Sequence, residues 1–160
     1  MRKRSKYRPR AVLTDPLLVL RPAAKADADA VMLRFLSALE TITAGSHPGD
    51  AEWRDLADAI NTVETLALTM HRLVPQEVMP TVNAAIAAMV GAANRYRAGG
   101  GMRVDGPGLV ALREVVGIYG QCLEELTGRE MAMARAETIR RMQAVLRRRS
   151  EDTDAKVVAL

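Results

Sequence analysis

Apolar residues recur every three or four positions over much of this chain, which is the spacing of residues on one face of an α-helix. The first such stretch spans about residues 24–44 and is followed by Gly45, a residue type that suits a helix C-cap. Its apolar positions follow one another at intervals of four, four and three residues: Val31, Phe35, Leu39 and Ile42. We expect this stretch to form a helix with one buried face.

A second helix is predicted from Asp50 to near Leu73, between a turn at residues 46–49 and Pro75. Asp50 is of a residue type that caps helix N-termini, and it is the expected N-cap here. This helix has the clearest apolar face in the chain. Its members are Trp53, Leu56, Ala57, Ile60, Val63, Leu66, Ala67 and Met70.

Two further helices are predicted, one over residues 80–97 and one that starts with Pro107 at its first position. Because the helix over residues 80–97 is rich in alanine, neighbours can approach it on more than one side, and we expect it to be the most enclosed helix. Residues 127–130 fit a capping box. Either a new helix begins there or the preceding one continues to about Arg149, and the pattern leaves both open.

These elements predict an all-α protein, a bundle of about four to five helices with a disordered basic N-terminal arm. We divide the chain into the arm and linker (residues 1–22), the helical bundle (23–149) and an acidic flexible tail (150–160). The apolar segment Leu17–Leu20 either packs across the body as an extended strap or begins a short helix after Asp15-Pro16.

The charges of the chain are unevenly distributed, and this distribution predicts that the helical bundle binds a partner. The formal net charge is +4, but residues 1–10 carry +6 and residues 129–149 carry +5. Residues 11–128 carry −5 and residues 150–160 carry −2. Basic segments of this kind bind phosphate backbones by neutralising charge, and a tyrosine among them can stack on an exposed base.

The candidate contacts with nucleic acid or another partner are therefore the side chains of the two basic segments. They are Arg2, Lys3, Arg4, Lys6, Tyr7, Arg8, Arg10, Arg140, Arg141, Arg147, Arg148 and Arg149. In the C-terminal segment we expect Arg140, Arg141 and Arg147 to face water. DNA, RNA and protein all remain open as the partner.

The residues that usually carry catalysis or hold metals are sparse. His47, His71 and Cys122 have no ligand spacing among them, and Cys122 lies on an apolar helix face, where a thiol behaves as a small hydrophobe. Asp55 and Asp58 are one helical turn apart, and a solvated helix face explains them more simply than a catalytic pair. We expect no catalytic residue, cofactor or metal, and hence no enzyme.

Two patches resemble small uncharacterised proteins carried by bacteriophages and prophages of proteobacteria. They are residues 2–10, running into Asp15-Pro16, and the patch Trp53–Ala59. The resemblance covers about a third of the chain. It implies an accessory phage protein, a class that acts by binding host machinery or nucleic acid and that includes inhibitors of host defence. It implies no catalytic residues.

The leading hypothesis is thus a non-enzymatic, phage-type protein that binds a host macromolecule, nucleic acid or a nucleoprotein complex, through its basic arm and helical surface. The alternative is an oligomeric assembly protein that associates with itself through the apolar positions Ile139, Met142 and Leu146. No stretch approaches the roughly 18 apolar residues of a membrane span, so we expect no membrane association and a place in the cytoplasm of the bacterial host cell.

Overall fold

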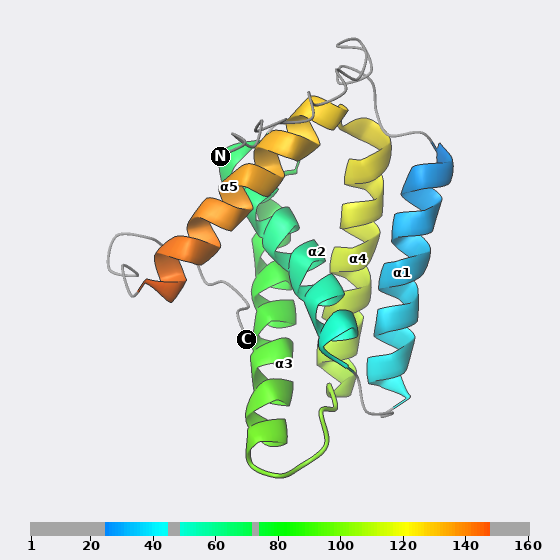
Figure 1. Ribbon diagram of the computed structural model, residues 1–160, viewed down its shortest axis with the longest axis vertical. Helices are drawn as coiled ribbons and strands as arrows, with labels where there is room; N and C mark the ends of the chain where they lie inside the picture. Colours follow the sequence, from blue (N-terminus) through cyan, green and yellow to red (C-terminus); the bar gives the residue numbers. More distant parts are fainter. Residues whose placement is uncertain (1–24, 45–48, 72–73, 148–160) are drawn as a thin grey trace, which may run out of the picture.

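The computed structural model describes residues 25–44, 49–71 and 74–147 (Figure 1). Within these ranges every regular element is helical, which confirms the all-α class and the expected number of helices. The predicted arm and linker (1–22) and the acidic tail (150–160) lie outside the described residues. The elements are α1 (Lys25–Thr43), α2 (Asp50–Thr69), the 3-10 turn η2 (Gln76–Val78), α3 (Met79–Arg97), α4 (Gly106–Glu125) and α5 (Gly128–Leu146).

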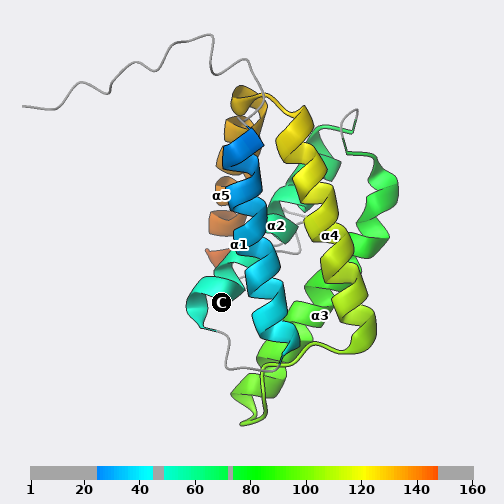
Figure 2. The ribbon, with the colours of Figure 1, turned by 90° about the vertical axis from the view of Figure 1, so that its right-hand side faces the viewer.

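Helix α2 is the centre of the bundle. It packs against α1, α3, α4 and α5 (Figures 1 and 2), and each of residues 59–67 along it is buried. The prediction that α3 is the most enclosed helix is therefore wrong. One side of α3 is open to solvent, at Asn83, Ala84, Ala87 and Val90. Alanine permits a close approach on every side, but its methyl group has little apolar area to bury, so packing a neighbour against the exposed side of α3 would add little stability.

The core is built from aliphatic side chains around a few aromatic rings. Phe35 of α1 meets Tyr119 of α4 edge-to-face, with ring centroids 5.0 Å apart and an interplanar angle of 83°. Trp53 of α2 is buried, and its indole Nε1 has no hydrogen-bond partner among the described residues. Burial of this one tryptophan makes it a natural fluorescent reporter of the core.

The starts of α2 and α4 lie one residue earlier than expected. The N-cap of α2 is Gly49, and Asp50 is the first helical residue. The N-cap of α4 is Asp105, whose side chain accepts a hydrogen bond of 2.8 Å from the backbone N–H of Gly108. Pro107 is therefore the second residue of α4, where it still needs no N–H partner.

Helices α4 and α5 are separate, which settles the alternative that the sequence left open. The backbone of Leu126 is extended, and Thr127 caps the next helix. The hydroxyl of Thr127 accepts from the backbone N–H of Glu130 at 3.2 Å, while the Glu130 carboxylate accepts from the backbone N–H of Thr127 at 2.9 Å. This reciprocal capping box starts α5 in a new direction, diagonally across α2 (Figure 1).

Candidate binding surface on helix α5

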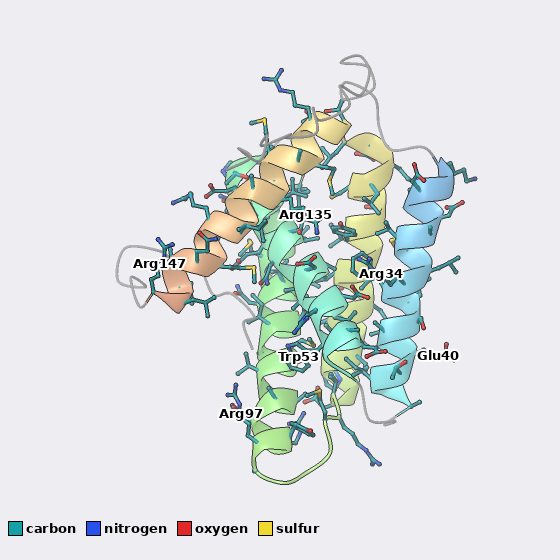
Figure 3. The ribbon with its side chains drawn as sticks, viewed as in Figure 1. Arg34, Glu40, Trp53, Arg97, Arg135 and Arg147 are labelled. Atoms are coloured by element: carbon teal, nitrogen blue, oxygen red, sulfur yellow. The ribbon has the colours of Figure 1, made fainter. Side chains whose placement is uncertain are left out.

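Helix α5 is the outermost helix, and its packing decides which of its arginines are available to a partner. One face rests on α2 and buries Ala134, Thr138 and Arg141. The opposite side is exposed and carries Arg129, Arg140 and Arg147. Figure 3 shows Arg147 at the far end of α5, away from the body of the bundle.

Arg129, Arg140 and Arg147 form one row, which we call the outer row. They are separated by eleven and seven residues. At roughly 100° per residue, these separations return each side chain to within about 20° of the last. With a rise of about 1.5 Å per residue, the Cα atoms are about 16 and 10 Å apart along the helix. Such spacing is too wide for one small anion and suits an extended polyanion.

Arg140, the middle member of the outer row, is held by a neighbouring acid. Its Nε and Nη2 atoms donate to the two carboxylate oxygens of Glu137 at 2.7 and 2.6 Å. This bidentate contact raises the pKa of Arg140 and lowers the pKa of Glu137. Exposed pairs of this kind contribute little to stability, so a phosphate can take the place of Glu137 at small cost.

Arg141 does not belong to this surface, and its prediction as a water-facing partner contact is wrong. The side chain is buried, its Nη2 lies 3.4 Å from a carboxylate oxygen of Glu64, and its Nη1 donates to the Thr65 hydroxyl at 3.1 Å. The Thr138 hydroxyl also donates to that of Thr65, at 2.9 Å. We call Glu64, Thr65, Thr138 and Arg141 the buried α2–α5 cluster. Arg141 follows Ala134 by seven residues and so shares the face that packs on α2.

One feature of the sequence could have predicted a buried ion pair here. Glu64 lies inside a stretch of α2 whose other positions are apolar or small and uncharged, residues 59–67. An acid in such a stretch needs a cationic partner if it is buried, and an arginine on the packed face of another helix supplies one.

Two further ion pairs connect α2 with its neighbours. Asp55 lies 3.1 Å from the Arg34 Nε of α1, and Asp58 lies 3.9 Å from an Nη of Arg135 on α5. Figure 3 shows Arg34 and Arg135 approaching the same side of α2 from different helices. Each carboxylate of the Asp55–Asp58 pair thus has its own guanidinium. Burial and the nearby Asp58 raise the pKa of the Tyr119 phenol, which lies on α4.

Cys122 is buried in α4, as expected for a thiol that acts as a small hydrophobe. Burial, with a smaller contribution from Glu125, raises the pKa of this thiol from 9.0 to about 11. Two pKa units lower the thiolate fraction about 100-fold at pH 8. We therefore expect iodoacetamide to alkylate Cys122 at least about 100-fold more slowly in the folded chain than in urea. Equal rates by mass spectrometry would contradict the buried position.

The remaining predicted contacts lie outside the described residues: residues 2–10 of the arm, with Arg148 and Arg149. In the described part of the chain, no three His, Cys, Asp or Glu side chains are grouped as metal ligands. His71 is exposed, and His47 lies outside the described ranges. None of the helices described here is both long enough and apolar enough to cross a membrane.

Comparison with known proteins adds no relative to this account. The chain matches no protein-family model, no curated protein and no solved structure.

Proposed function

We propose that this protein is a non-enzymatic binding protein whose partner is a nucleic acid or a nucleic-acid-bound complex. The observation that carries the proposal is the outer row of α5. It presents three guanidinium groups along one ridge of the molecule, on the side of the helix that no other described element covers.

The spacing of the outer row favours a polymer of phosphates over a single anion. Double-stranded DNA carries one negative charge per about 1.7 Å of its axis, so arginines about 10 and 16 Å apart each meet a phosphate of the same molecule. Arg148 and Arg149 continue the basic sequence directly after Arg147, and residues 2–10 add six more cations. Together these side chains supply the charge-neutralising contacts that dominate nucleic-acid affinity.

The proposal includes the phage-type role that the sequence resemblance implies. In that role the nucleic acid or nucleoprotein is a host component, and inhibition of a host defence is one outcome of occupying it. The support for this part is the resemblance of residues 2–10 and Trp53–Ala59 alone.

Binding to random duplex DNA, single-stranded DNA and RNA, measured by fluorescence anisotropy over a range of salt concentrations, tests the proposal. For the form that binds, replacing Arg129 and Arg147 by glutamine is expected to lower the slope of log K against log salt by about 1.4–1.8, since each phosphate contact contributes about 0.7–0.9. Deleting residues 2–10 is expected to lower it further. The affinity should fall at least tenfold in either variant.

The matched control replaces Arg97 and Arg103 by glutamine. Both are exposed near the loop between α3 and α4, so this variant loses the same net charge away from α5. It is expected to retain most of the slope. Equal losses of slope and affinity in the two double variants would show that binding depends on net charge and not on the outer row. Absence of binding to all three nucleic acids at low salt would refute the proposal.

The alternative function is self-association through α5. The observation that favours it is the exposure of Ile139 (48%) and Leu146 (62%) on the flank of α5, with the half-buried Met142 between them. Sedimentation of the full chain distinguishes the two: a monomer at all concentrations excludes assembly and leaves the binding proposal standing.

A further inference from the structure

An apolar groove runs between α1 and α4, on the side of these helices that faces away from α2. Figure 2 looks onto this side of the molecule, with α1 and α4 lying next to each other in front. The groove has a volume of about 330 Å³. It is lined by Leu36, Leu39, Glu40, Thr43, Ala44 and Arg113.

The apolar surface continues beyond the groove onto the outer faces of both helices. Leu33, one turn before Leu36 on α1, is 67% exposed, and Leu36 itself is 49% exposed. Val110, one turn before Arg113 on α4, is exposed as well. Exposed aliphatic side chains that are contiguous with a groove mark a surface that is covered by another segment or molecule.

We propose that the groove is covered by residues 17–20 of the same chain, Leu17-Leu18-Val19-Leu20, folded back along α1 as an extended strap. These residues lie outside the described part of the chain. The connection to α1 is short, because only residues 21–24 separate them from Lys25.

The length of the chain fits this path. Leu20 and Leu17 precede Lys25 by five and eight residues. At about 3.3–3.6 Å per extended residue, they reach about 17 and 27 Å from the start of α1. Leu36 and Thr43 follow Lys25 by eleven and eighteen residues, which is also about 17 and 27 Å along a helix. An antiparallel strap therefore brings the four apolar residues level with the groove lining.

The local sequence favours an extended strap over a helix. Pro22 has no backbone N–H and biases Arg21 toward an extended backbone, so the chain leaves α1 without continuing its helix. An extended segment must also satisfy its backbone polar groups. Glu40 and Arg113 line the groove and offer one acceptor and one set of donors for this purpose.

The proposed strap has a consequence for the N-terminal arm. With Leu17 seated near Thr43, residues 1–10 start from the end of the body where α1 terminates, and not from the end where it begins. The strap does not depend on nucleic-acid binding and is tested without it.

Disulfide trapping in the full-length chain tests the strap. In a Cys122→Ala background, Leu36→Cys is combined with either Leu20→Cys or Val19→Cys, the strap positions nearest to the level of Leu36, because neighbouring residues of an extended strap face opposite ways. The control combines the same two substitutions with Val90→Cys. Val90 is similarly exposed (44%) but belongs to α3, which α2 and α4 separate from α1.

For one of the two strap positions, the intramolecular disulfide with position 36 is expected to form at least tenfold faster than that with position 90. Peptide mapping without reduction measures both. Equal rates at positions 36 and 90 would overturn the proposal, and disulfides formed only between molecules would assign the groove to a second copy. In the unsubstituted chain, at least one amide of residues 18–20 is expected to exchange hydrogen at least tenfold more slowly than in a free peptide, and exchange at the free-peptide rate for all three would also overturn the proposal.

Discussion

Replacing Arg141 by methionine is expected to lower the free energy of unfolding by about 3–5 kcal/mol, because it removes one member of a buried ion pair and with it the guanidinium that faces the buried carboxylate of Glu64. Glu64 is 2% exposed, and the Arg141 side chain that faces it is 9% exposed. Most domains are stable by only about 5–15 kcal/mol, so this single change removes a large share of the total.

In this variant, α5 is expected to unfold before the rest of the bundle. Among the described elements, α5 packs mainly on α2, and the buried α2–α5 cluster lies within that contact. The buried side chains on this face of α5 are Ala134, Thr138 and Arg141, and Met131 packs partly buried against the core, so two of the three buried side chains belong to the polar cluster.

Urea unfolding followed by two probes measures both effects. Circular dichroism reports all the helices, and the fluorescence of Trp53, which is buried in α2, reports the core. In the Arg141→Met variant, helical signal is expected to be lost before the fluorescence changes, whereas both probes should coincide in the unmodified chain.

The matched control is Arg140→Met, one residue away in the same helix. Arg140 makes an equally direct pair with Glu137, but on the exposed side of α5, so its loss is expected to change stability by less than about 1 kcal/mol. The double variant Glu64→Leu, Arg141→Met is expected to recover much of the stability, since both members of the buried ion pair are then replaced by apolar side chains. A cost for Arg141→Met no greater than for Arg140→Met would contradict the assigned role of the cluster.

The same cluster links stability to the proposed function. The outer row lies on the side of α5 opposite the buried face, so the position of its arginines is set by how α5 rests on α2. A variant that loosens α5 should therefore weaken binding of a rigid duplex more than binding of a flexible single strand, which can follow the displaced helix.

Most of the helices could be predicted from the sequence because the signals are local. The spacing of Val31, Phe35, Leu39 and Ile42 requires only that one face be buried, and α1 buries three of these four fully. The capping box at Thr127 and Glu130 likewise acts within four residues, and it ends one helix and starts the next.

The choice of which helix is central could not be predicted, since it depends on how the helices pack together. Glu64, Thr65 and Asn61 are polar in sequence, yet all three are buried because α5 lies across that side of α2. The pattern of α5 alone gives no reason to separate Arg141 from Arg140. Only the direction of α5 after Leu126 decides which of the two arginines meets α2.

Replacing Gly108 by alanine is expected to destabilise the protein by about 1–3 kcal/mol, although alanine is the better helix former. Gly108 is buried near the start of α4, on the side that faces Ala88 of α3. A Cβ atom there would lie 2.5 Å from the Cβ of Ala88 and 2.7 Å from a side-chain carbon of Val104. Carbon atoms pack at about 3.5–4.0 Å, so α3 and α4 must move apart.

The same helix offers a control of opposite sign. Gly117 is exposed on α4, and a Cβ added there meets no atom within 4 Å. Gly117→Ala is therefore expected to stabilise the protein by about 0.5–1 kcal/mol through helix propensity alone. Urea unfolding of the two variants measures the contrast. Helix propensity favours alanine at both positions, so only the close approach of α3 can reverse the sign at Gly108. Stabilisation by Gly108→Ala as well would therefore contradict that close approach.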